Sequence, residues 1–184
     1  MTTGDSVTPS DNPVNAPLEL TDQQRANLLK LAEGLLTLPD LIESQGLHFS
    51  MKDFFKTEPR SPKRRIASTI EDYNCGTAAC ALGYGPYLGI TPNPGEDSWF
   101  DYADEAFGTC TPGRMVTDAQ SMLWNWLFSN RWTSLDNTPD GAARRIFWFL
   151  KNGLPATLRQ PYDTVDAPKI EAYPGESYQY REPS

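Results

Sequence analysis

The middle of this 184-residue chain contains no basic side chain. Residues 66–113 have no Lys, Arg or His, but they carry seven Asp and Glu residues. The whole chain has 16 Lys and Arg against 24 Asp and Glu, which gives a formal net charge of −8, and nearly all of this excess lies in that stretch. A protein that binds nucleic acid without sequence preference needs surplus Lys and Arg facing the phosphates. The charge distribution therefore argues against that class of function.

Cysteine and histidine are also scarce, with three Cys and one His. An odd number of cysteines argues against a disulfide framework and indicates a reducing compartment. No apolar run approaches the length of about 18 residues that indicates a membrane-spanning helix. Residues 1–17 contain neither the basic region nor the apolar stretch of a secretory signal. We therefore expect a cytoplasmic protein that does not contact a membrane.

Aromatic residues compensate for a modest hydrophobic content of 39%, since the chain has five Trp, eight Tyr and eight Phe. Bulky rings bury much area per residue, and the chain length fits one domain. We expect residues 1–19 to form a disordered arm and residues 20–155 to form a single domain. Residues 156–184 are expected to be a tail that is either extended or wrapped around that domain.

Hydrophobic periodicity predicts a mainly α, compact fold of about five helices with long loops. The first helix begins with a capping box from Thr21 to Gln24, covers residues 22–37 and ends before Pro39. The other predicted helices cover residues 78–82, 97–107, 117–128 and 138–152.

The apolar side of each predicted helix is assigned to the core. In the first helix the residues that recur at helical spacing are Leu28, Leu29, Leu31, Ala32, Leu35 and Leu36. In the last helix the inward stripe is Ala142, Ile146, Phe149 and Leu150, whereas the residues expected to lie elsewhere are Arg144, Arg145 and Lys151. The tryptophans assigned to the core are Trp124, Trp126, Trp132 and Trp148. His48 lies between Leu47 and Phe49, so we expect it to be buried or half-buried.

The segment from Cys75 to Tyr84 is the most distinctive in the chain, and three interpretations of it remain open. Thr77 is a candidate N-cap for the short helix that follows, so Cys75 precedes a helix N-terminus, where a thiolate is favoured and can act as a nucleophile. Alternatively, Cys75 and Cys80 are buried packing residues, and Gly76 and Gly83 permit close contact between helices. The same segment could also line a ligand pocket.

A metal site is a weaker interpretation of the same residues. Three cysteines and the histidine would have to come together, and no two cysteines have the spacing of about two to four residues that is usual at zinc sites. The four residues concerned are His48, Cys75, Cys80 and Cys110. We therefore expect neither a metal nor a cofactor.

Two charged segments are candidate surfaces for a partner. The basic one is a proline-containing loop that includes Arg60, Lys63, Arg64 and Arg65. The acidic one is a face of the helix predicted over residues 97–107, and it carries Asp97, Asp101, Asp104 and Glu105. The opposite face of this helix carries the apolar residues Phe100, Ala103 and Phe107, and Gly108 follows as its C-terminal residue. Each segment could equally be a solvated surface with no partner.

The cysteine segment, Cys75-Gly76-Thr77-Ala78-Ala79-Cys80-Ala81-Leu82-Gly83, resembles a signature of small proteins that are common in bacteriophage, prophage and some bacterial genomes. The further pieces of the resemblance follow in order: Phe49-Ser50-Met51, Phe107-Gly108, Leu127-Phe128, and Thr138-Pro139 with Ala143, Arg145 and Ile146. The family has a histidine where this chain has Tyr84, which puts any role of that imidazole in doubt. The resemblance spans about residues 21–153 and implies a phage or mobile-element setting, with the host cytoplasm as the location.

These observations favour a non-catalytic accessory protein that binds a host protein or a small ligand, and antagonism of a host defence is one instance of such a role. One alternative is a cysteine-dependent enzyme with Cys75 as the nucleophile. A second alternative is a structural component of a larger assembly, in which the chain ends order against their neighbours. The sequence leaves the partner and the oligomeric state open.

Overall fold

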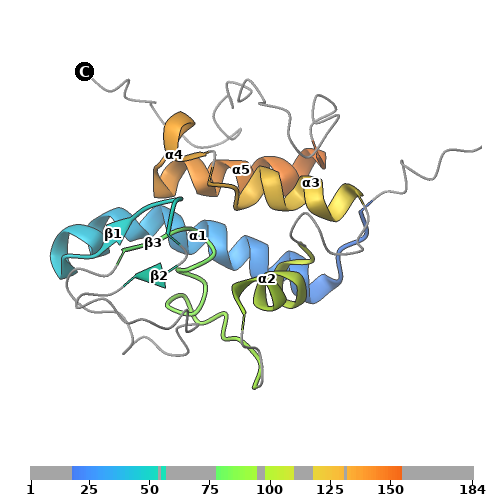
Figure 1. Cartoon of the computed structure of the whole chain (residues 1–184), viewed down its shortest axis with the longest axis horizontal. Helices are drawn as coiled ribbons and strands as arrows, with labels where there is room; N and C mark the ends of the chain where they lie inside the picture. The colour runs from blue at the N-terminus through green and yellow to red at the C-terminus, as the bar shows by residue number, and fades with distance from the viewer. Residues whose placement is uncertain are drawn as a thin grey trace, which may run out of the picture.

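The computed structural model describes residues 18–53, 55–56, 78–94, 98–109, 118–130 and 132–154, and these residues are mostly helical, as the periodicity predicts. The helices are α1 (Asp22–Gln45), α2 (Trp99–Phe107), α3 (Asp118–Leu127), α4 (Trp132–Leu135) and α5 (Pro139–Asn152). In Figure 1, α1 runs through the middle of the molecule, with α3 and α5 on one side and α2 and a small sheet on the other. The predicted C-terminal tail and nearly all of the predicted N-terminal arm lie outside the described residues.

Helix α1 begins as predicted but ends later. The Thr21 side chain accepts a hydrogen bond from the backbone N–H of Gln24, and the Gln24 side chain accepts one from the backbone N–H of Thr21. The predicted end near residue 37 is wrong, because the helix continues through Pro39 to a left-handed Gly46 with φ 63°. A proline inside a helix removes one backbone hydrogen bond. Burial of Leu38, with further apolar packing beyond Pro39, offsets that loss.

The cysteine segment contains a strand where a helix was predicted. Strand β3 (Ala78–Ala79) lies between β1 (His48–Phe49), to which it is parallel, and β2 (Phe55–Lys56), to which it is antiparallel. The Cys80 N–H donates to the Asp53 carbonyl at 2.7 Å, and the Ala79 carbonyl accepts from Ser50 at 2.9 Å. These backbone groups are thus satisfied by neighbouring chain segments and not by a local helix, so the prediction of a helix over 78–82 is wrong.

Helix α2 is held at both of its ends. Ser98 is the N-cap, and its hydroxyl accepts a hydrogen bond from the backbone N–H of Asp101. Gly108 ends the helix in the left-handed region at φ 68°, as predicted. The last turn has no basic side chain, and amides of α1 contact its carbonyls instead: Gln24 donates to the carbonyls of Asp104 and Glu105, and Asn27 donates to that of Ala106. The apolar side of α2 therefore meets the core while its end is fixed against α1.

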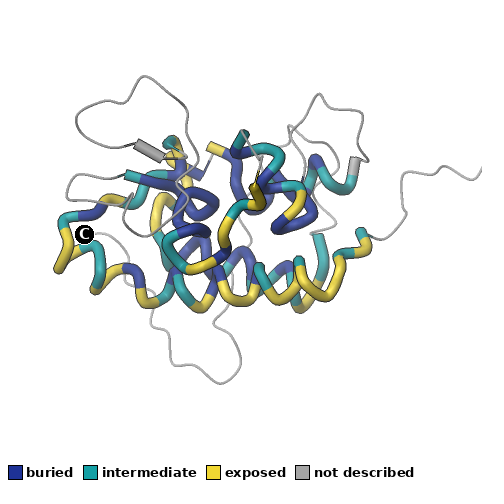
Figure 2. The backbone as a smooth tube through the Cα atoms, turned by 90° about the horizontal axis from the view of Figure 1, so that it is seen from below, coloured by how far each residue is buried: buried dark blue, intermediate teal, exposed yellow. Residues whose placement is uncertain are grey.

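The core lies between α1 and the elements around it, and Figure 2 shows the buried side of the α1 tube facing the rest of the molecule. Trp124, Trp126 and Trp132 are buried as predicted, whereas Trp148 is only half-buried. The inward stripe of α5 is confirmed for Ala142, Ile146 and Phe149, and Leu150 is half-buried.

The prediction that Arg145 lies outside the core is wrong, because its side chain is 1% exposed and stacks on Trp132. An arginine can be buried when aromatic stacking and an acidic neighbour compensate in part for lost hydration. Helix α4 and the residue after it supply both groups. No helix among the described residues combines the length and the apolar character needed to cross a bilayer.

The turns that follow β3 pack against α2 where Gly85 contacts Tyr102, and a substitution at Gly85 tests this packing. A Cβ atom at Gly85 would lie 2.2 Å from the Tyr102 hydroxyl oxygen, which donates a 2.5 Å hydrogen bond to the carbonyl of Ile90. We expect Gly85→Ala to lower the free energy of unfolding, measured in urea, by about 2 kcal/mol, because the hydroxyl must move from its acceptor.

The matched control is Tyr102→Phe, alone and combined with Gly85→Ala. The phenylalanine ring carries no oxygen at the point of collision, so the loss in the double variant should be smaller than the sum of the two single losses. Strict additivity would contradict this account of the contact.

Candidate functional site

Cys80 is the one cysteine of the signature that the structure describes, and it is a packing residue. Its side chain is fully buried next to Ala79, Ala81 and Leu82. Burial raises the pKa of the Cys80 thiol to about 11, because a thiolate in this apolar environment would lose its hydration. Cys80 therefore has the opposite properties to those of a reactive cysteine. Cys75, Gly76 and Thr77 lie outside the described residues.

Tyr84, the last residue of the distinctive segment, joins the turns after β3 to strand β1. It is fully buried, and its hydroxyl donates a 2.9 Å hydrogen bond to the backbone carbonyl of His48. Its ring stacks on Phe49 at a centroid distance of 6.2 Å and meets Tyr87 edge-on at 6.0 Å. Burial raises the pKa of Tyr84, so its phenol stays protonated and serves as a donor. Gly83 is buried in the same turn.

The prediction that His48 is buried is wrong, because the residue is exposed on β1. In a strand, successive side chains point to opposite faces, so the buried neighbour Leu47 and the exposed His48 follow the pleat. The structure thus uses the backbone of His48 for Tyr84 and leaves the imidazole at the surface. Among the described residues, no group of three His, Cys, Asp or Glu side chains is placed to hold a metal ion.

The acidic face of α2 is engaged within the fold at each position that the structure describes. Asp101 is half-buried and accepts a 2.7 Å hydrogen bond from the Ser98 hydroxyl. Asp104 is half-buried, and the exposed Glu105 accepts a hydrogen bond from the Asn93 amide. The Asp101 carboxylate thus contributes to the N-terminal end of α2, and that of Glu105 binds the loop before the helix. Asp97 and the basic loop with Arg60, Lys63, Arg64 and Arg65 lie outside the described residues, as does Cys110.

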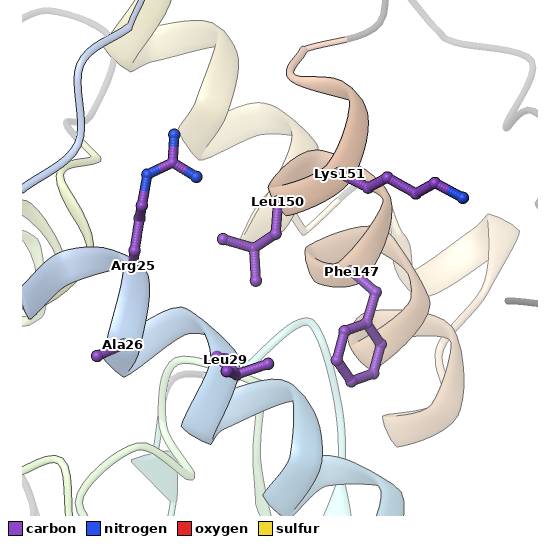
Figure 3. A pocket seen from close by; sticks show the side chains of 6 residues that line it. All are labelled: Arg25, Ala26, Leu29, Phe147, Leu150 and Lys151. Carbon is purple, nitrogen blue, oxygen red and sulfur yellow. The ribbon is translucent and has the colours of Figure 1, made fainter. Parts of the chain in front are cut away.

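The described residues form a groove between the start of α1 and the end of α5. It has a volume of about 500 Å³, and the residues that line it are Arg25, Ala26, Leu29, Phe147, Leu150 and Lys151. Figure 3 shows the Leu150 side chain pointing into the space between the two helices, with Arg25 and Leu29 across from it on α1. Leu29, Phe147 and Leu150 give the groove an apolar lining, with Arg25 beside it on α1, whereas the amino group of Lys151 points away from α1.

Sequence reasoning identified none of the groove residues as a site, and Leu29 is the one whose exposure differs most from its prediction. It was assigned to the inward stripe of the first helix, but it is 43% exposed, whereas the adjacent Leu28 is fully buried. Successive residues of an α-helix point about 100° apart, so Leu29 lies at the edge of the face that Leu28 and Leu31 bury. In the sequence, the adjacent leucines Leu28 and Leu29 indicated that the apolar surface of this helix is wider than its buried face.

Comparison of the chain with models of known families, with curated proteins and with solved structures finds no match.

The environment of Cys80 predicts a chemical behaviour that can be measured directly. We expect Cys80 in the folded protein to resist alkylation by iodoacetamide at pH 8 by at least about 100-fold relative to the unfolded chain, because the thiol is buried and its pKa is raised. Peptide mass spectrometry after timed labelling follows each of the three cysteines separately. Rapid labelling of Cys80 in the folded chain would contradict its role as a packing residue.

Proposed function

We propose that this chain is a non-catalytic binding protein, and that its groove between α1 and α5 receives an apolar group bearing negative charge. The exposed Leu29 carries the proposal. It is one of two large hydrophobic side chains exposed among the described residues, and it lies in the groove. The host protein or small ligand expected from the sequence would supply the apolar group.

The size and lining of the groove support such binding. Ligand pockets of proteins have volumes of about 300–1,000 Å³ and are mostly apolar, with a few polar groups that set orientation. This groove has a volume of about 500 Å³, with Leu29, Phe147 and Leu150 as its large apolar side chains. Removal of apolar surface from water contributes about 25 cal/mol per Å². Burial of these three side chains by a ligand would therefore supply the main driving force.

The charges at the groove support a negatively charged occupant. Arg25 on α1 and Lys151 on α5 line the site, and Arg25 lies in the first turns of α1, where the helix dipole also favours an anion. The chain as a whole has a net charge of −8 and would repel anions, so a cation beside an apolar groove is a local exception. Charge complementarity of this kind sets orientation and partner choice more than affinity.

The resemblance of the cysteine segment supports the biological setting. A phage or mobile-element protein that acts by binding would present such a surface to a molecule of its host, and antagonism of a host defence is one form that this binding would take. The fully buried Cys80, with its raised pKa, supports a role of this residue in organising the fold next to β3.

The test uses 1-anilinonaphthalene-8-sulfonate, a probe that joins an apolar aromatic body to an anion. We expect saturable binding to the folded full-length chain, detected by fluorescence. Leu29→Gln should weaken binding about tenfold, because it replaces an apolar contact worth about 1–2 kcal/mol. Arg25→Gln should weaken it less, about two- to fivefold, because the cation is exposed and its attraction is screened.

The chain offers matched controls for both variants. Leu135→Gln changes the other exposed large hydrophobic residue, which is 54% exposed on α4, and Lys52→Gln removes an exposed cation. Neither residue lines the groove, so neither variant should change the probe affinity. Equal losses at Leu29 and Leu135 would show that the probe binds any exposed leucine, and this outcome would refute the proposal.

A further inference from the structure

The guanidinium group of Arg145 lies away from the groove and is a charged group that is almost completely buried. Its side chain is 1% exposed, and its central carbon lies 4.0 Å from the centre of the Trp132 ring. The Trp132 indole N–H donates to the Asn125 carbonyl at 3.1 Å, and Trp126 meets the Trp132 ring edge-on at 5.6 Å. The cation is therefore held in one orientation by a fixed aromatic plane.

Only one edge of this guanidinium has a partner among the described residues. Nη1 lies 3.6 Å from a carboxylate oxygen of Asp136 and 3.5 Å from its backbone carbonyl. Both contacts are long, and burial lowers the pKa of Arg145 to about 9 although the Asp136 charge opposes the shift. Within the part of the chain that the structure describes, nothing accepts a hydrogen bond from Nε or Nη2, and both atoms are buried.

Nε and Nη2 together form the side-on fork of an arginine. Their N–H bonds are coplanar and nearly parallel, a geometry that matches the two oxygens of a carboxylate or the terminal oxygens of a phosphate. A buried cation with an unpaired donor edge is costly, so a group that pairs this edge stabilises the folded chain as it binds.

We propose that the Nε–Nη2 edge of Arg145 binds an oxyanion, either a carboxylate or a phosphate group. On the Nη1 side the neighbour of Arg145 is a surface residue, since the Asp136 side chain is 37% exposed. Asp136 itself is held by the Thr138 hydroxyl, which donates to its other oxygen at 2.7 Å, and the absence of a side chain at Gly141 leaves room for its carboxylate. The carboxylate holds Nη1 and leaves the opposite edge for the ligand.

Asp136 affects the anion affinity of this site in two ways. Its negative charge orients the guanidinium but also repels a second anion a few ångströms away. Replacement by the neutral, equally sized asparagine keeps a hydrogen-bond acceptor near Nη1 and removes the repulsion. Loss of the fork and loss of the neighbouring charge should therefore change anion affinity in opposite directions.

The experiment follows the side-chain Nε–H signal of Arg145 by ¹⁵N NMR in the full-length chain. Sodium phosphate and sodium acetate are titrated at constant ionic strength, with sodium chloride as the reference salt. We expect a saturable shift of the Arg145 signal with phosphate, with acetate or with both, and the two titrations show which source of oxyanion the fork prefers. Chloride offers one atom in place of two oxygens, so it should produce no such shift.

Two variants and one control sharpen this result. Arg145→Lys keeps the charge but loses the fork, so oxyanion binding, measured on the whole protein by calorimetry, should weaken at least about tenfold. Asp136→Asn should tighten it several-fold. Arg144→Lys is the matched control, because Arg144 is the adjacent arginine on α5, pairs with Asp140, and should leave the affinity unchanged.

The wild-type titration keeps the proposal falsifiable even if Arg145→Lys does not fold. An Arg145 Nε–H signal that does not move with phosphate or acetate, or that moves equally with chloride, would overturn the proposal. So would weaker binding in Asp136→Asn. Because Arg145 does not line the groove between α1 and α5, each of these results leaves the groove proposal intact.

Discussion

The apolar face of α1 is the constraint on which the rest of the structure depends. Leu28, Leu31, Leu35 and Leu38 are fully buried along it, at the spacing of one helix face. Helix α5 packs against this face from one side, and α2 contacts the start of α1 from the other. The same helix positions the groove, because Arg25 and Leu29 lie beside the buried stripe and face the end of α5. The proposed binding site thus lies at the edge of the leucine stripe, where Leu29 is exposed beside the buried Leu28.

The signature segment has a structural role that its composition did not reveal. Small residues at Ala78 and Ala79 suit a central strand with neighbours on both sides, and the buried Cys80 and Tyr84 fix the turns that follow. The Tyr84 hydroxyl reaches the backbone of β1, which a shorter side chain would not do at the same place. The described part of this segment, from Ala78 to Tyr84, thus contributes packing and hydrogen bonds to the fold, whereas the proposed binding surfaces are the α1–α5 groove and Arg145.

Local chemistry made some features predictable and tertiary contacts decided the others. The start of α1, the end of α2 and the start of α5 depend on Thr21, Gly108 and Thr138, whose side chains or backbone preferences act within one turn, and all three were predicted. The continuation of α1 past Pro39, the strand at Ala78–Ala79 and the burial of Arg145 depend on partners distant in sequence. The local sequence pattern does not show which distant residues will be in contact. Tertiary contacts therefore overrode the local secondary-structure propensity at these positions.

The central claim is that the groove between α1 and α5 is the binding surface, and locating a bound probe tests it most directly. Intermolecular nuclear Overhauser effects between the naphthalene protons of 1-anilinonaphthalene-8-sulfonate and the protein's side chains measure which residues the probe contacts. The account predicts contacts to Leu29, Phe147 and Leu150, the large apolar residues of the groove. Contacts to Leu135 without contacts to these three residues would contradict it.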